Sequence, residues 1–184
     1  MRWTFRELFD DYFKERFKEK YGHLYMRLGR MIALIVFISF FGQMVIVPTE
    51  SMSPTIEPKD FIFLYRHDEE YNRGDIVSFR APFEEGVQYM KRIVGLEGER
   101  IAIHSGAVYI NGVSLEEDYA VSSLDVEMEE VLIPADSYFM MGDNRDNSFD
   151  SREFGAIHQD EIVGRAIRTL YPLSRWSSLT TERD

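Results

Sequence analysis

Cysteine is absent from this chain of 184 residues. Its absence excludes a disulfide framework, a cysteine-ligated zinc site and a thiol nucleophile. The chain also lacks a glycine-rich phosphate-binding motif, and its four histidines have no metal-ligand spacing. A formal net charge of −11 leaves no basic surplus for binding nucleic-acid phosphates. We therefore expect no cofactor, no metal ion and no nucleic-acid partner.

One acidic loop, residues 142–152, has the composition of a calcium-binding loop but not its order. With Asp146 in the first position, Ser151 stands where the loop needs glycine. Ile157 then stands where the loop needs a bidentate acid. The sequence therefore argues against an EF-hand calcium site.

Residues 31–47 are an apolar run of seventeen residues without a charge. At about 1.5 Å per helical residue, the run is near the lower limit for crossing a bilayer, and residues 24–28 could lengthen it. A buried core helix and a cleaved signal peptide are the alternatives, but the run has no polar face and no small-x-small cleavage site follows it. We predict a single-pass signal anchor in the cell inner (cytoplasmic) membrane. Its basic flank predicts residues 1–30 in the cytoplasm and residues 48–184 outside.

Residues 4–22 place five aromatic side chains near one stripe of a helix. They are Phe5, Phe9, Tyr12, Phe13 and Phe17. We expect an amphipathic helix on the inner membrane surface, with a dimer contact as the alternative.

The extracytoplasmic region, residues 48–184, consists of short β-like runs separated by turn signals. It is predicted to be mainly β, an antiparallel catalytic domain with a small β insertion at about residues 99–135. Two hairpin signals, Ser105-Gly106 and Asn111-Gly112, lie in that insertion. The predicted strands are residues 61–65, 75–80, 87–94, 100–104, 107–111, 130–133, 138–141 and 162–171.

Two segments have residues that suit catalysis. Residues 47–56 form a stiff stretch with two prolines and four hydroxyl side chains, which fits a linker or a held serine nucleophile. In residues 87–94, strand alternation places Lys91 on one face with Tyr89 and Ile93. Burial there would lower the lysine pKa from its usual value near 10.4 and make the amine a usable general base. The alternative is an edge-strand lysine with its ammonium group in water.

Four motifs in order resemble those of the bacterial-type type I signal peptidases. The first is residues 48–55 (PTESMSPT), and the second is residues 74–77 (GDIV). The third is residues 89–95 (YMKRIVG), and the last is residues 142–155 (GDNRDNSFDSREFG). Each motif alone is weak evidence, but the ordered set is specific.

The resemblance implies a Ser/Lys dyad, with Ser51 as nucleophile and Lys91 as general base. It implies that the Thr49 hydroxyl and the Ser51 backbone N–H form the oxyanion hole, and that Ser148 orients the Lys91 amine. Other residues follow from the resemblance as structural support (Asp143, Asp146, Asp150, Arg152) or as the border of shallow apolar substrate pockets (Val47, Pro48, Met52, Ile56, Tyr89, Met90).

The implied function is a membrane-bound serine endopeptidase that removes signal peptides from secretory preproteins after small residues, typically Ala-x-Ala. Its expected partners are these preproteins, the lipid bilayer and, as a functional neighbour, the export machinery. A self-cleaving Ser/Lys peptidase, a conjugation-type maturation peptidase and a non-catalytic membrane-anchored β-domain are the alternatives. The last would have no need to keep Ser51, Lys91 and Ser148 together.

Overall fold

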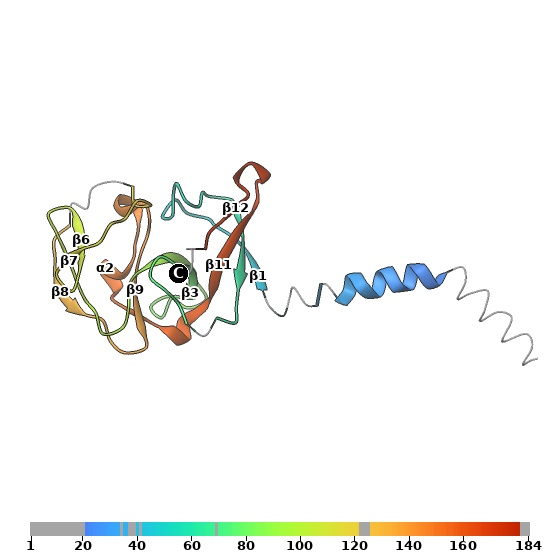
Figure 1. Cartoon of the computed structure of the whole chain (residues 1–184), viewed down its shortest axis with the longest axis horizontal. Coiled ribbons are helices and arrows are strands. Elements are labelled where there is room, and N and C mark those ends of the chain that lie inside the picture. The colour runs from blue at the N-terminus through green and yellow to red at the C-terminus, as the bar shows by residue number, and fades with distance from the viewer. Residues whose placement is uncertain are drawn as a thin grey trace, which may run out of the picture. The chain divides into compact units, whose positions relative to one another are not determined.

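The computed structural model describes residues 21–33, 35–36, 40, 42–68, 70–121 and 126–180 (Figure 1). The chain divides into two compact units, Met1–Phe41 and Gly42–Asp184. In the first unit, residues 21–33 are helical, and apolar side chains such as Leu24, Met31 and Ile35 are exposed. The predicted amphipathic helix of residues 4–22 lies almost wholly outside the described residues. Within the described residues, no helix is both long enough and apolar enough to cross a membrane.

The predicted apolar span of residues 31–47 is wrong at its C-terminal end. Residues Gly42–Ile46 form strand β1, which pairs antiparallel with β2 (Phe61–Tyr65). Gly42 lies so close to the Phe63 ring that an added Cβ would stand 2.3 Å from it. The β-branched residues that follow suit a pleated strand, and pairing with β2 satisfies their backbone groups. The compact β unit therefore begins at residue 42 rather than residue 48.

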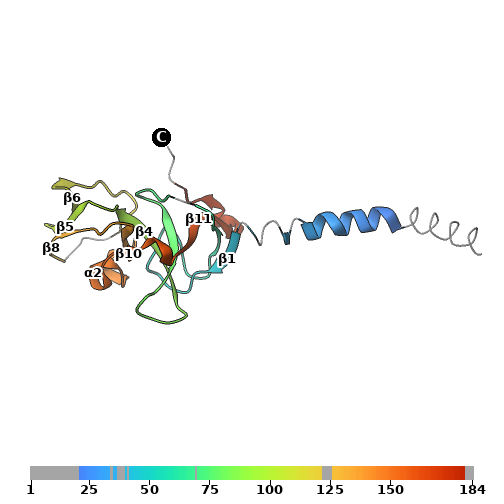
Figure 2. The ribbon, with the colours of Figure 1, turned by 90° about the horizontal axis from the view of Figure 1, so that it is seen from below.

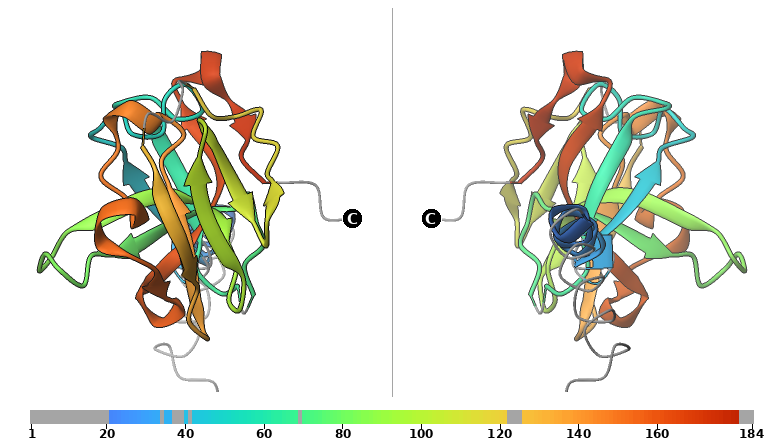
Figure 3. Two further views of the ribbon diagram at one scale, coloured as in Figure 1. Left: turned by 90° about the vertical axis from the view of Figure 1, so that its left-hand side faces the viewer. Right: turned by 90° about the vertical axis from the view of Figure 1, so that its right-hand side faces the viewer.

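Eight strands of the second unit form one antiparallel sheet, in the order β1-β2-β11-β3-β4-β9-β10 with β12 paired to β11. The other strands of this sheet are β3 (Ile76–Arg80), β4 (Gln88–Gly95), β9 (Ser137–Met141), β10 (Ile157–His158), β11 (Ile162–Tyr171) and β12 (Ser177–Ser178). Strand β4 lies between β3 and β9 and is therefore an inner strand. Figure 3 shows the green β3–β4 hairpin extending away from the rest of the sheet.

A second, four-stranded sheet lies within the predicted insertion, in the order β7-β6-β5-β8. Its strands are β5 (Arg100–His104), β6 (Ala107–Ile110), β7 (Val113–Ser114) and β8 (Met128–Leu132). Figures 1 and 2 show this sheet at the end of the unit opposite β1. Both turns use the expected residues, since Ser105-Gly106 and Asn111-Gly112 all have positive φ, as a type I′ turn requires.

The helical elements of the second unit are short: η1 (Arg145–Asn147), α2 (Ser151–Phe154), η2 (Gln159–Glu161) and η3 (Leu173–Arg175). The prediction of a mainly β, antiparallel fold is therefore confirmed. One core cluster joins the loop after β1 to the sheet, because Met52 and Ile56 are fully buried beside Ile62 and Leu64 of β2. This packing fixes the position of the serine-containing segment.

Candidate active site

The predicted nucleophile and base lie in direct contact. The Nζ atom of Lys91 donates a hydrogen bond of 2.6 Å to Oγ of Ser51. Both residues are buried, and Lys91 is only 2% exposed. Burial lowers the pKa of Lys91 from 10.5 to about 8, an effect that the carboxylate of Asp150 partly opposes. At pH 7, roughly one amine in ten is therefore uncharged, against about one in a few thousand for an exposed lysine.

Strand β4 explains why this lysine is buried. Its backbone pairs with β3 at Val77, and its neighbours two residues away on the same face are Tyr89 and Ile93. The Tyr89 ring centroid lies 5.8 Å from Lys91 Nζ. The alternative of an edge-strand lysine with its ammonium group in water is therefore wrong.

The loop between β1 and β2 holds Ser51 through backbone hydrogen bonds on both sides. Val47 N donates to Asp60 O at 3.1 Å, and Ile56 N donates to Met52 O at 2.9 Å. The Thr49 hydroxyl lies 3.4 Å from the Ser51 hydroxyl, close enough to act on the same substrate carbonyl. The segment is thus a structured loop rather than a flexible linker.

Arg175 of η3 holds the same loop, which the sequence did not indicate. Its guanidinium donates to the carbonyl of Pro54 at 2.9 Å and to that of Thr55 at 3.3 Å. It also donates to the buried carboxylate of Asp60 at 3.0 Å. No local sequence pattern connects the C-terminal segment with the serine loop.

The loop after β9 packs directly against Ser51. An added Cβ on Gly142 would lie 2.3 Å from Ser148 Oγ and 2.4 Å from the Ser51 carbonyl oxygen, so only glycine fits there. The backbone N–H of Asn144 donates to the Ser51 carbonyl at 3.1 Å. Glycine therefore permits the close approach of the first and last motifs.

Asp150 is the central acceptor of this loop. It accepts hydrogen bonds from Ser148 Oγ at 2.7 Å, Arg152 Nε at 2.8 Å and Gly142 N at 3.0 Å. The described structure shows no hydrogen bond between Ser148 and Lys91, and the Ser148 hydroxyl donates to Asp150. Asp146, also expected in support, is exposed in η1 and forms no ion pair within the described ranges.

Arg92 and Asp143 form a buried ion pair on the other face of β4. The guanidinium donates to both carboxylate oxygens, at 2.8 and 2.7 Å, and to the Gly74 carbonyl at 2.8 Å. The Thr55 hydroxyl donates to Asp143 at 2.6 Å. Sequence reasoning missed the role of Arg92, although strand alternation places it opposite Lys91 on an inner strand, where a buried arginine needs a carboxylate partner.

The insertion contributes two side chains to this network. The Tyr119 ring lies 4.0 Å from the Arg92 guanidinium carbon, in cation–π geometry. Glu117 accepts two hydrogen bonds from Arg145, at 2.9 and 2.7 Å. Burial is the main cause that raises the pKa of Tyr119, and nearby Glu117 adds to it. No motif in the sequence indicated these contacts.

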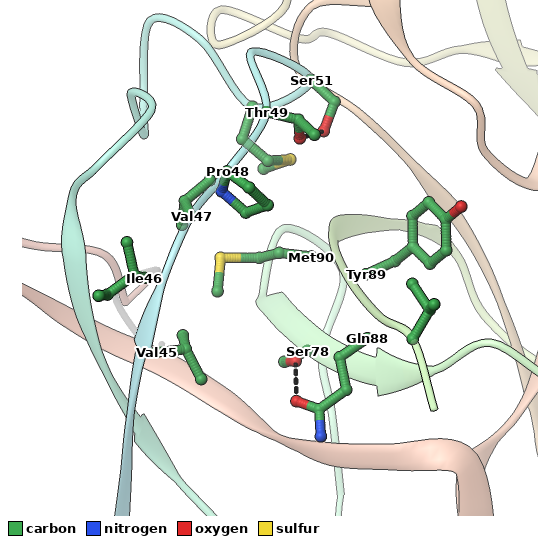
Figure 4. Close-up of a pocket in the computed structure, with 12 residues that line it drawn as sticks. Val45, Ile46, Val47, Pro48, Thr49, Ser51, Ser78, Gln88, Tyr89 and Met90 are labelled. Carbon is green, nitrogen blue, oxygen red and sulfur yellow. Dashed lines mark hydrogen bonds between the residues drawn. The ribbon is translucent and has the colours of Figure 1, made fainter. Parts of the chain in front are cut away.

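A groove of about 420 Å³ ends at Ser51 (Figure 4). Its walls are the chain from β1 into the serine loop and the first half of β4, and Figure 4 shows Met90 reaching across between them. Five of the six predicted pocket residues line it, whereas Ile56 is fully buried in the core. The lining residues are Val45, Ile46, Val47, Pro48, Thr49, Ser51, Met52, Ser78, Val87, Gln88, Tyr89 and Met90. In the described ranges, no three His, Asp or Glu side chains converge as a metal site.

Comparison with known proteins shows the family of this chain. The family model described as signal peptidase, peptidase S26, matches residues 23–171. The chain belongs to this family. It is 36% identical to the signal peptidase I of Leptolyngbya laminosa over 152 residues, which covers 77% of this chain and 74% of that protein. It is 33% identical to signal peptidase I P of Bacillus subtilis subsp. natto, covering 79% of this chain and 87% of that one.

Among solved structures, a signal peptidase I of Enterococcus faecalis V583 is 34% identical. It aligns with 53% of this chain and 97% of its own, with a TM-score of 0.47. Membership of the family makes the chain a hydrolase of the serine endopeptidase class that processes signal peptides.

Proposed function

We propose that Ser51 and Lys91 are the nucleophile and general base of a membrane-bound endopeptidase that removes signal peptides after small residues. The observation that carries the proposal is the 2.6 Å hydrogen bond between a buried lysine amine and the serine hydroxyl. A lysine whose pKa falls to about 8 can accept a proton near neutral pH.

The reaction is acyl transfer to serine, followed by hydrolysis. Neutral Lys91 takes the hydroxyl proton while Ser51 Oγ attacks the scissile carbonyl, and then gives that proton to the leaving amine. Water attacks the acyl-enzyme in turn, with Lys91 as its base, and Ser51 regains its proton on release of the new carboxylate. The Ser51 N–H and the Thr49 hydroxyl stabilise the oxyanion, a contribution often worth about 3–4 kcal/mol per donor.

The groove supports an extended peptide with small side chains. In the described structure β1 pairs only with β2, and residues 88–90 of β4 pair only with β3, so both walls present a free strand edge. An extended peptide between them can form main-chain hydrogen bonds with either edge. Met90, Val47 and Pro48 give the groove beside Ser51 an apolar lining, which suits small apolar side chains such as those of Ala-x-Ala before the scissile bond.

The supporting residues hold the dyad by charge and by packing. Asp150, fixed by Arg152 and Ser148, stands near enough to Lys91 to raise its pKa against the effect of burial. Ser148 therefore acts on the base through Asp150. Asp143 balances Arg92 behind the serine loop.

A membrane anchor before β1 would place Ser51 close to the bilayer surface. Residues 24–41 would extend about 27 Å as a helix, close to the ~30 Å hydrocarbon core. Arg27 and Arg30 would reach back to the interface, and residues 1–23 would remain on the cytoplasmic side, beside the export machinery. A preprotein anchored in the same layer meets the site at a raised effective concentration.

The test uses the full-length chain in detergent micelles and a peptide with an Ala-x-Ala site. Ser51→Ala and Lys91→Ala should each abolish cleavage while circular dichroism shows an intact fold. Ser53→Ala, two residues from the nucleophile, is the matched control and should retain activity. For the unsubstituted chain, kcat/KM should rise with pH through about 8 and then level off, because only the uncharged amine accepts the proton. Cleavage by Ser51→Ala would overturn the proposal.

A further inference from the structure

Two half-exposed phenylalanines form an aromatic patch with Tyr89 beside the groove. Phe83 is 44% exposed and Phe149 is 48% exposed. Their ring centroids are 5.6 Å apart. The ring centroid of Tyr89 lies 5.8 Å from that of Phe83 and 6.4 Å from that of Phe149. Phe154 lies against Phe83 at 4.8 Å and supports the patch. Exposed aromatic surface of this kind is typical of binding sites.

The loop after β9, which contains Ser148 and Asp150, determines where Phe149 points. Ser148 and Asp150 both have extended backbone conformations, and both side chains take part in the buried network. Because successive side chains of an extended chain point to opposite sides, Phe149 faces outward. The Phe149 side chain takes no part in that network, so the buried hydrogen bonds do not require an aromatic residue at this position.

The patch continues the groove on the side of the general base. Tyr89 lines the groove and also belongs to the patch. Its ring lies 5.8 Å from Lys91 Nζ, the atom that must reach the leaving amine. A peptide chain that leaves the site past Lys91 would meet the edge of the groove at Tyr89 and then Phe149.

We infer that this aromatic patch binds an apolar side chain of the preprotein's mature part, within about four residues after the scissile bond. The inference rests on the proposed function. An extended chain advances about 3.3 Å per residue, so the distances from Lys91 to Tyr89 and on to Phe149 correspond to roughly four residues. The exposed Glu84 and Glu85 beside the patch disfavour an anionic lipid surface as its occupant. The patch is thus a specificity surface for the leaving part of the substrate.

The experiment measures kcat/KM for a set of peptides that share one Ala-x-Ala site. In each peptide, one of the first four positions after the scissile bond carries Phe, Leu or Ser. At one of these positions, Phe and Leu should raise kcat/KM roughly tenfold over Ser, which is the size expected for one well-buried apolar side chain. Phe149→Ser and Phe83→Ser should remove this preference, and Phe149→Leu should keep most of it.

Val113→Ser, at an exposed apolar residue of the small sheet, is the matched control and should leave the preference unchanged. The all-Ser peptide should be cleaved equally by the unsubstituted chain and by Phe149→Ser. Absence of any cleavage would contradict the proposed function itself. Cleavage with no preference at any of the four positions would overturn this inference alone. A preference that Phe149→Ser leaves intact would also overturn it.

Discussion

The two faces of strand β4 bury two neighbouring cations in opposite ways. Lys91 is 2% exposed and Arg92 is 6% exposed, so both have left bulk water. Arg92 forms an ion pair with both oxygens of Asp143, and its guanidinium lies over the Tyr119 ring. Lys91 forms no ion pair in the described structure, and its hydrogen-bond partner is the neutral hydroxyl of Ser51.

The difference shows how one strand separates structure from chemistry. A guanidinium does not lose its proton in a protein, so a buried arginine requires carboxylates. A lysine ammonium can lose its proton, so burial without a paired carboxylate lowers its pKa and raises the neutral fraction of the amine. The same burial therefore holds the loops together on one face of β4 and, on the other, lowers the pKa of the lysine that we propose as the base.

The largest expected effect is on activity, when Lys91 is replaced by arginine so that both faces of β4 carry a guanidinium. Lys91→Arg should reduce kcat/KM by a factor of about 10³ or more, because a guanidinium cannot act as a base near neutral pH. The measurement is steady-state cleavage of an Ala-x-Ala peptide. A variant that keeps activity within tenfold would contradict the role of the neutral amine.

Asp143→Asn should leave the buried charge of Arg92 without its carboxylate partner. Removing one partner of a buried pair leaves an uncompensated charge and should lower the free energy of unfolding by roughly 3–5 kcal/mol. Urea denaturation measures this change. Asp146→Asn, at an exposed aspartate of the same loop, is the control and should change the stability by less than about 0.5 kcal/mol.

Lys91→Met should stabilise the fold at neutral pH while abolishing activity. The folded-state pKa of about 8 lies below the value near 10.5 in the unfolded chain, so the native lysine lowers stability wherever the unfolded chain is protonated. The gain should approach about 3 kcal/mol below pH 8, decline as the pH rises, and vanish above pH 10.5. Denaturation of both chains across this range is the test, and a gain that does not depend on pH would show that packing alone causes it.

Tyr119→Leu should have the smallest effect. Loss of the ring over Arg92 should lower the free energy of unfolding by about 1 kcal/mol. Tyr119→Phe keeps the ring and should recover most of that loss, even though it removes the hydrogen bond to Glu117. Equal destabilisation by both variants would show that the hydroxyl, rather than the cation–π contact, carries the contribution.

Local patterns in the sequence predicted most of the fold. Alternation in residues 87–94 placed Lys91 between Tyr89 and Ile93, and β4 has that arrangement. The two hairpin dipeptides predicted the turns of the small sheet. Hydrophobicity alone misplaced the end of the apolar run, because residues 42–46 are as apolar as a membrane helix and yet pair with β2.

Local sequence patterns did not predict most of the contacts around Ser51 and Lys91. The ordered motifs indicated that the serine, the lysine and the loop after β9 come together. They did not indicate that Ser148 donates to Asp150, or that Arg175 and Tyr119 reach the same network from distant segments. These contacts join residues that are far apart in the chain, so no local period or propensity reports them.

By itself, the sequence determined the family, the mainly β architecture, and which serine and lysine to expect side by side, because each depends on residue type, order or local periodicity. Only the tertiary structure decided the state of that lysine. Its pKa depends on how much water the packed strands and loops exclude and on which charges they bring near, and these are properties of the assembled fold.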